Sequence, residues 1–259
     1  MFPRPDFSDD WPVISIMSRP SPGGASGAFL GIDCNSKQWW VKPLNNGLWE
    51  QTIVTDYIVG KLGILIGASV CDVAVVVINE DLEDQVFRPA SGLKLQAGLA
   101  HGSRHLEDAI EKRSNLLHRD RDDNSRRHAG LFALYDWCWG DDDQWLHCGS
   151  QDMATFSHDH GLYLPRRQGE RGWTVDALEE NRETPHMPKW DRTGLDENEI
   201  ARITTRFRNM SPAEIEEILC TVPSSWPVSD NELTALRNFL ICRLGPCADR
   251  LDNVLEGRR

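Results

Sequence analysis

The sequence predicts an α+β protein with two lobes, a β-rich N-terminal lobe over residues 1–105 and a helical C-terminal lobe over residues 106–259. Most runs rich in valine, isoleucine and aromatic residues fall in the first part of the chain. The later part contains two capping boxes, in which Ser211 or Ser229 precedes a glutamate by three positions. Strands followed by helices are typical of α+β proteins, and the cleft between two lobes is a usual place for a small ligand.

The N-terminal lobe is expected to begin with three antiparallel strands. A glycine-rich stretch, residues 18–27, separates the first strand from the second, and a short Asp-Cys-Asn-Ser turn separates the second from the third. Further along, apolar residues spaced three and four apart predict an amphipathic helix, and a run of valine and isoleucine predicts a buried strand. The expected elements are strands at Val13–Met17, Ala28–Ile32, Gln38–Lys42 and Val73–Ile78, a helix at Trp49–Leu65, and a strand with a connector at Gly92–Leu106.

The C-terminal lobe is expected to be mainly helical. Residues 113–127 mix both charges, which favours a solvated loop or an exposed helix face. Residues 129–139 are apolar and aromatic enough for a core helix, whereas residues 140–157 have the composition of a loop that ends in a short strand-like segment. The helix that begins at Ser229 is expected to end at Gly245-Pro246, because glycine and proline commonly follow a helix end.

Composition limits the classes of partner. The formal net charge of −12 argues against binding along a nucleic-acid backbone, which needs a basic surface. Seven cysteines without a Cys-x-x-Cys pair favour a reducing compartment over a disulfide framework. No apolar stretch has the length and continuity of a signal peptide or a bilayer-spanning helix. We therefore expect a cytoplasmic protein with no nucleic-acid or membrane partner.

The first candidate for chemistry is Lys42, at the end of the predicted strand Trp-Trp-Val-Lys. It can be an edge-strand lysine with its amine in water, or an ammonium group held at nucleotide phosphates. The glycine-rich turn one strand upstream supports the second interpretation, because glycines let backbone amides approach phosphate oxygens. Asp56, in the predicted helix, is the preferred carboxylate partner of this lysine, with a solvent-facing acid as the alternative. The expected nucleotide contacts in the turn are Gly23, Gly24, Ser26 and Gly27.

Two acid-rich segments in the second lobe indicate a metal site. They are Gly-Asp-Asp-Asp at 140–143 and Ser-His-Asp-His-Gly at 157–161. Neighbouring acids repel one another unless a cation neutralises them. An Asp-x-Gly sequence directly after a strand is where kinases hold the magnesium that bridges nucleotide phosphates, so Asp159 is the expected principal metal ligand. The alternatives are an acidic turn with surface histidines, or a metallohydrolase site built from Asp141, Asp143, His147, His158, Asp159 and His160.

Five segments, taken together and in order, carry a resemblance to a known family. They are Trp40-Val-Lys-Pro-Leu-Asn-Asn46, Lys61-Leu-Gly-Ile-Leu-Ile-Gly67, Gly102-Ser-Arg104, Ala133-Leu-Tyr-Asp-Trp-Cys-Trp-Gly140 and His158-Asp-His-Gly161. In these segments the chain resembles the short HipA-like kinases, bacterial relatives of a toxin kinase that are distantly similar to phosphatidylinositol kinases. The resemblance implies a bilobal protein-kinase-like fold with ATP and Mg²⁺ between the lobes, and transfer of the γ-phosphate to a hydroxyl of a protein or a small molecule.

The resemblance also implies roles for single residues. Lys42 would match the phosphate lysine, with Asp56 near its acidic helix partner. The segment Gly98–Ser103, with His101 in it, would lie near the connector that faces adenine. Asp143 would match the aspartate that accepts the proton of the acceptor hydroxyl, and Asp159 would match the principal magnesium ligand.

The sequence departs from the family in its catalytic loop. The family usually carries an asparagine about five residues after the catalytic aspartate as a second metal ligand, and here that position falls at His147 or Cys148. We expect Asp141, as an extra acid, and His147 to take part in the metal site instead. A catalytically impaired nucleotide-binding regulatory module is the alternative function that this departure favours.

Overall fold

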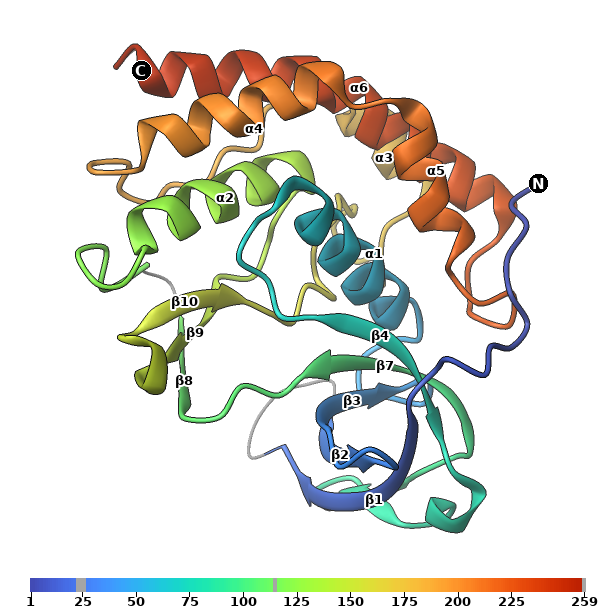
Figure 1. Cartoon of the computed structure of the whole chain (residues 1–259). Coiled ribbons are helices and arrows are strands. Elements are labelled where there is room, and N and C mark those ends of the chain that lie inside the picture. The colour runs from blue at the N-terminus through green and yellow to red at the C-terminus, as the bar shows by residue number, and fades with distance from the viewer. Residues whose placement is uncertain (22–26, 114–115, 258–259) are drawn as a thin grey trace.

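The structure is a computed structural model that describes residues 1–21, 27–113 and 116–257. Its strands are β1 Val13–Pro20, β2 Phe29–Asp33, β3 Gln38–Pro43, β4 Val73–Ile78, β5 Val86–Arg88, β6 Leu93–Lys94, β7 Gly98–Arg104, β8 Ala109–Arg113, β9 Gln144–Cys148 and β10 Ala154–Ser157. Its α-helices are α1 Gln51–Ile66, α2 Asn124–Trp137, α3 Val175–Asn181, α4 Glu197–Asn209, α5 Pro212–Cys220 and α6 Asp230–Leu255. In Figure 1 the strands β1–β4 and β7 lie at one end, α4 and α6 lie at the other, and α1 and α2 lie between them.

Five strands of the N-terminal part form a closed barrel in the order β1-β2-β3-β7-β4. The first three form the predicted antiparallel meander, and β1 closes the barrel by pairing in parallel with β4. Lys42 on β3 lies opposite His101 on β7. Because successive side chains of a strand point to opposite faces, Val41 is buried in the apolar core of the barrel while Lys42 points away from it.

Helix α1 is buried on nearly every side, whereas the sequence predicted a single apolar face. Twelve of its 16 residues are buried, because it contacts β4 and β7 of the barrel on one side and α2 and α5 on the other. Two glycines permit this close packing: Gly60 lies against Val73, and Gly63 lies against Val70. Helix α1 therefore joins the barrel to the helical part of the chain.

The C-terminal part departs from the prediction between residues 140 and 157. Besides the short strand expected at its end, this stretch contains β9, so that most of it is not a loop. The strands β8, β9 and β10 form an antiparallel sheet with β9 in the centre. This sheet lies beside α2, at the edge of the helical part, as Figure 1 shows.

Helix α6 also differs from the prediction, because it does not end at Gly245-Pro246 but continues to Leu255. A proline inside a helix costs about 3 kcal/mol. Cys247, Ala248 and Leu251 beyond it are all buried against the core. Burial of one large apolar side chain contributes about 1.5–3 kcal/mol, so the apolar face of this last part outweighs the lost hydrogen bond.

Two apolar clusters hold the molecule together. The smaller one fills the barrel, and the larger one joins α1 to α2 and to the helices of the C-terminal part. A barrel followed by a mainly helical part confirms the predicted α+β class. In the part of the chain that the structure describes, no helix combines the length and the apolar character needed to cross a bilayer.

Candidate active site

Three side chains from distant parts of the chain meet at one point: Lys42 near the end of β3, Asp56 in α1, and Asp159 just after β10. The Nζ of Lys42 lies 2.5 Å from Oδ2 of Asp56 and 2.7 Å from Oδ1 of Asp159. Lys42 and Asp56 are almost fully buried, whereas the side chain of Asp159 is 33% exposed. One ammonium group therefore connects the barrel, α1 and the segment after β10, and Asp159 keeps an open side.

The His-Asp-His-Gly segment turns sharply to bring Asp159 to α1. Asp159 has a left-handed backbone conformation, with φ of 54°. His160 is buried, and its Nε2 lies 2.8 Å from Oγ of Ser157, which fixes the turn to the end of β10. A Cβ atom on Gly161 would lie 3.0 Å from Oδ2 of Asp56 and 3.2 Å from Cβ of Thr52, so a larger residue would crowd the turn against α1.

The three side chains carry one more negative than positive charge when all are ionised. Burial lowers the pKa of Lys42, but the two carboxylates outweigh it and hold that pKa above its ordinary value. Burial raises the pKa of Asp159, but Lys42 outweighs it and holds that pKa below its ordinary value. Burial raises the pKa of Asp56 to about 6, against the opposing effect of Lys42. An ionised, partly exposed carboxylate beside excess negative charge suits a hard divalent cation.

This triad lies on the wall of a cavity of about 530 Å³ between the barrel and the sheet of β8–β10. The volume is within the range of small-molecule sites. Two buried atoms on the wall, Oδ1 of Asp56 and Nδ1 of His101, have no hydrogen-bond partner among the described residues. Because buried polar atoms are normally satisfied, they indicate that a polar ligand completes the site.

Trp40 gives the cavity an aromatic wall. The guanidinium of Arg19 lies 5.3 Å from the Trp40 ring centre, and the ring of His105 meets it edge-on with centroids 5.9 Å apart. Leu146 of β9 also lines the cavity. Flat apolar and aromatic surfaces of this kind accept a planar ring such as adenine.

The glycine-rich turn is described only at its edges. Ser21, which precedes the glycines of this stretch, and Ala28, which follows them, line the cavity. Gly23, Gly24 and Ser26, which we expected to contact phosphate, lie outside the described residues. Gly27 is described, has φ of 70°, and lies against the side chain of Arg88 rather than among the lining residues.

The three consecutive acids at 141–143 point to three different partners. Asp141 accepts a hydrogen bond from the guanidinium of Arg166, and Asp142 accepts one from the side-chain amide of Gln144. Asp143 accepts one from the indole N–H of Trp190, whose nitrogen lies 3.1 Å from its Oδ1. Of these three partners, Gln144 alone lines the cavity, which it shares with Asp159. The structure therefore separates three acids that the sequence placed in one cluster.

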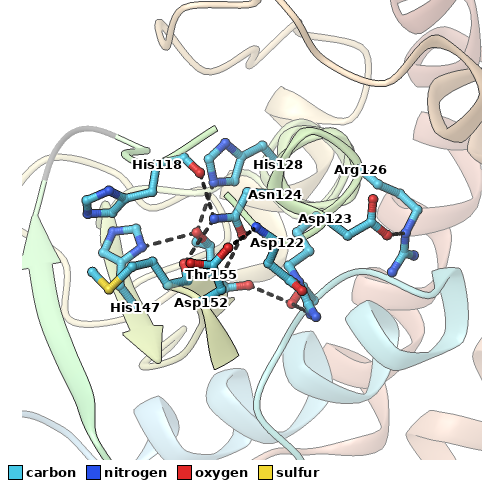
Figure 2. Close-up of polar contacts among 12 residues, drawn as sticks. His118, Asp122, Asp123, Asn124, Arg126, His128, His147, Asp152 and Thr155 are labelled. Carbon is cyan, nitrogen blue, oxygen red and sulfur yellow. Dashed lines mark hydrogen bonds and ion pairs between the residues drawn. The ribbon is translucent and has the colours of Figure 1, made fainter. Parts of the chain in front are cut away.

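His147 lies on the face of β9 opposite to Gln144, and the structure does not bring it to Asp159. Its Nδ1 lies 3.1 Å from Oγ1 of Thr155, which also lies 3.0 Å from Nε2 of His128, as Figure 2 shows. The expected pairing of His147 with Asp159 at a metal does not form, because alternate side chains of a strand point to opposite faces. Within the described ranges, no group of three or more histidine, cysteine, aspartate or glutamate side chains could hold a metal ion.

Two aromatic residues from the segment after α3 hold the acid loop in place, and sequence patterns did not indicate them. Nε2 of His186 lies 2.6 Å from the carbonyl oxygen of Gly140, and its ring stacks on Trp139 with centroids 4.2 Å apart. Trp190 donates to Asp143. Both residues are more than 40 positions away from the loop that they contact. No local pattern marks a contact over that separation.

Arg243 of α6 fixes the end of α2, from which the acid loop begins. It is 1% exposed and donates to the carbonyl oxygens of Asp136, Trp137 and Thr184 at 2.5, 3.0 and 2.7 Å. The last carbonyl groups of a helix have no partners within it, so Arg243 satisfies groups that would otherwise be buried without one. A buried arginine thus positions the start of the loop.

No protein-family model matches this sequence, and no curated protein matches it. Solved structures match its fold. The crystal structure of the Helicobacter pylori proinflammatory kinase CtkA has a TM-score of 0.60 and 10% identity, covering 94% of this chain and 98% of that chain. The Golgi casein kinase has a TM-score of 0.51 and 11% identity over 97% and 77% of the two chains. Its structure with Mn/ADP bound has a TM-score of 0.51 and 11% identity over 95% and 74%.

These likenesses show the fold alone, because the identities are 10–11%. They confirm the predicted bilobal, kinase-like fold. They do not distinguish the HipA-like kinases from other kinases.

Proposed function

We propose that this chain transfers the γ-phosphate of ATP, bound with Mg²⁺, to a hydroxyl group of a protein or a small molecule. The observation that carries this proposal is the contact of Lys42 with Asp56 and Asp159 on the wall of a cavity, in a kinase-like fold. In kinases, a strand lysine held by a helix acid contacts the nucleotide phosphates, and an aspartate after a strand holds the metal. The Golgi casein kinase neighbour was solved with Mn/ADP bound, which supports a nucleotide and a divalent metal here.

Each charged residue of the triad has a task in this reaction. Asp56 holds Lys42, so that its permanent charge neutralises phosphate oxygens without first having to reorganise. Asp159 is ionised and would hold the metal, because its Oδ1 contacts Lys42 and its carboxylate is partly exposed. A bound Mg²⁺ would withdraw negative charge from the phosphate oxygens.

Asp143 is the residue that we propose as the acceptor of the hydroxyl proton. The indole N–H of Trp190 fixes one of its oxygens at 3.1 Å. Burial raises the pKa of Asp143, and this hydrogen bond opposes the rise. The fixed orientation would align the acceptor, so that catalysis depends on positioning more than on covalent chemistry by the protein.

We assign the nucleobase to the part of the cavity lined by Trp40 and Leu146, with His101 of β7 near the nucleotide. Burial, reinforced by the charge of Lys42, lowers the pKa of His101 well below its ordinary value. His101 is therefore neutral at physiological pH and offers a hydrogen bond rather than a charge. The assignment to the HipA-like type rests on the motif resemblance, including the Trp-Val-Lys-Pro segment that contains Trp40.

The test replaces Asp159 with Asn and measures ATP turnover with Mg²⁺. We expect a loss of at least about 100-fold, because the substitution removes the carboxylate that would hold the metal. Asp84→Asn is the matched control, because Asp84 is an exposed acid that pairs with Lys94 on the surface, and it should leave turnover unchanged. Equal turnover in the two variants would refute the proposal.

A nucleotide-binding regulatory module without turnover is the second candidate. It is favoured by the altered loop, in which no asparagine follows Asp143 and His147 points away from the cavity. Thermal-shift titration of the wild-type chain with ATP, with and without Mg²⁺, separates the candidates when combined with the turnover assay. Magnesium-dependent stabilisation with no turnover by the wild type would identify the module.

A further inference from the structure

Helix α1, which lies between the barrel and the helical part of the chain in Figure 1, carries Asp56 between two anchored neighbours. Successive residues of a helix point about 100° apart, so Thr55, Asp56 and Tyr57 face three different directions. The indole N–H of Trp173 donates to Oγ1 of Thr55 at 3.0 Å. The hydroxyl of Tyr57 donates to Oγ1 of Thr221, also at 3.0 Å. Contacts with the helical part on both sides of Asp56 therefore set the direction in which it points.

The contact between Trp173 and Thr55 is the more buried of these two anchors. Trp173 is 2% exposed and Thr55 is 1% exposed, whereas Thr221 is an exposed residue. The Thr55 hydroxyl also donates to the carbonyl oxygen of Gln51 at 3.2 Å, so it is used both as donor and as acceptor. Because a buried indole N–H is costly without an acceptor, this hydrogen bond favours one rotational position of α1 about its axis.

Trp173 ends a segment that begins at Asp159, and both ends of this segment contact α1. Near the first end, a Cβ atom on Gly161 would lie 3.2 Å from Cβ of Thr52, so the backbone there packs closely on the helix. At the other end Gly172, with φ of 83°, has a left-handed conformation that glycine adopts without strain, and it directly precedes Trp173. The segment is therefore attached to the same helix twice.

Lys42 depends on the separation of its two carboxylate partners. Its Nζ lies 2.5 Å from Oδ2 of Asp56 and 2.7 Å from Oδ1 of Asp159, so a shift of either carboxylate would weaken one of the contacts. Asp56 belongs to α1, whereas Asp159 opens the segment that ends at Trp173. The hydrogen bond from Trp173 to Thr55 joins this segment to α1 beside Asp56, and it therefore fixes the two carboxylates relative to each other.

We propose that Trp173 is a positioning residue for phosphoryl transfer. Its hydrogen bond to Thr55 keeps Asp56 directed at Lys42, and so keeps the ammonium group in place for the nucleotide phosphates. This inference rests on the proposed function and adds to it a residue that does not line the active-site cavity. A charge held in advance stabilises the transition state without reorganising, so loss of the anchor should lower kcat more than it changes KM.

The experiment measures kcat and KM for ATP on the full chain with Mg²⁺, at a temperature where each variant is folded. Trp173→Phe keeps an aromatic ring and removes the donor, whereas Thr55→Val keeps the shape of threonine and removes the acceptor. In each variant we expect kcat to fall by at least about 10-fold and KM for ATP to change by less than about 3-fold. The double variant Trp173→Phe/Thr55→Val should lose no more kcat than either single variant, because all three lack the same hydrogen bond.

Two controls separate positioning from a general loss of stability. Thr55→Ser keeps the hydroxyl acceptor and should retain kcat within about 2-fold of the wild type. Arg202→Ala removes the 2.7 Å hydrogen bond to the carbonyl oxygen of Ile66, which lies about 15 Å along α1 from Asp56. This second control should lower the urea midpoint and leave kcat within about 2-fold of the wild type.

Three results would overturn the inference. The first is wild-type kcat in both Trp173→Phe and Thr55→Val. The second is an equal loss of kcat in Thr55→Ser and Thr55→Val, which would show that the hydroxyl is not the group that matters. The third is an equal loss in Arg202→Ala, which would assign the effect to stability. Thr55→Val, the smaller change, decides the test if Trp173→Phe does not fold.

Failure of the inference is distinguishable from failure of the proposed function. A wild-type chain whose turnover is lost in Asp159→Asn and kept in Trp173→Phe and Thr55→Val would refute the role of Trp173 and leave the proposed function standing. A wild-type chain without turnover would refute the proposed function, and the positioning role with it.

Discussion

Replacing Lys42 with Met tests the central contact of the site, because it removes the cation and keeps most of the side-chain volume. Asp56, 1% exposed, then has no positive partner at 2.5 Å. A buried carboxylate without a partner takes up a proton rather than remain charged. We therefore expect Asp56 to be neutral at pH 7.5 in the variant, and ATP turnover to be lost.

The size of the effect follows from the pKa of Asp56. Protonating a carboxyl with an ordinary pKa of 3.8 at pH 7.5 costs about 5 kcal/mol, at about 1.4 kcal/mol per pH unit. In the wild type, the rise of this pKa to about 6 in the folded state already lowers the free energy of unfolding by about 3 kcal/mol of these 5. The free energy of unfolding of the variant is therefore lower than that of the wild type by about the remaining 2 kcal/mol. The variant also lacks the attraction of Lys42 to Asp159, so we expect its free energy of unfolding to be lower by about 3–5 kcal/mol in total.

The assay is urea unfolding of the wild type and Lys42→Met at pH 7.5 and pH 5.0. At pH 5.0 Asp56 is largely protonated in both proteins, so the penalty of the substitution should be smaller by about 2 kcal/mol. The double variant Lys42→Met/Asp56→Leu removes the buried carboxyl and should recover stability without recovering turnover. A penalty below about 1 kcal/mol at both pH values, or no recovery in the double variant, would refute the reasoning.

Three further measurements test other parts of the structure. Because burial raises the pKa of Asp56 to about 6, ATP turnover should fall as the pH drops through 6 and this acid loses its charge. A flat turnover profile from pH 7 to pH 5 would contradict this assignment. The same raised pKa means that the folded state binds the proton of Asp56 more tightly than the unfolded state does, so the contribution of this group to the free energy of unfolding should rise as the pH falls from 6 to 4. Trp173→Phe removes the 3.0 Å hydrogen bond from its indole to α1 and should lower the unfolding free energy by about 1–3 kcal/mol, whereas an unchanged urea midpoint would show that this anchor contributes nothing. Arg243→Leu should cost about 3–5 kcal/mol in urea unfolding, because it leaves Asp136 with one cation fewer and several carbonyl groups without a donor, while exposed Arg208→Ala should cost less than about 1 kcal/mol; similar values for the two would argue against the buried network.

Local sequence patterns identified the elements on which the triad is built. The strand that contains Lys42, the helix after it and the Asp-x-Gly segment each depend on residues close together in the chain, so short-range physical chemistry marks them. The assignment of Lys42 and Asp159 to one site between the lobes rested on their motifs and on the family resemblance, and the structure joins the two side chains across 117 positions. The same patterns failed where burial decided the outcome, as in α6, where apolar contacts carry the helix past Pro246.

The spatial roles of Asp141, Asp142 and Asp143 could not be predicted, because adjacent residues in a loop have no fixed periodicity. The failure at His147 had a different cause. Residues 140–157 were expected to be a loop, so the alternation of side chains along β9 was not applied, and it places His147 and Gln144 on opposite faces.

The sequence alone determined the α+β class and the order of elements, because these follow from periodicity and turn residues, and its kinase-like motifs singled out Lys42 and Asp159. Only the tertiary structure decided which partner each acid of the loop contacts, and which distant residues hold that loop. His186, Trp190 and Arg243 act through long-range packing and hydrogen bonds. Such contacts depend on how whole elements pack, and no short stretch of sequence specifies them.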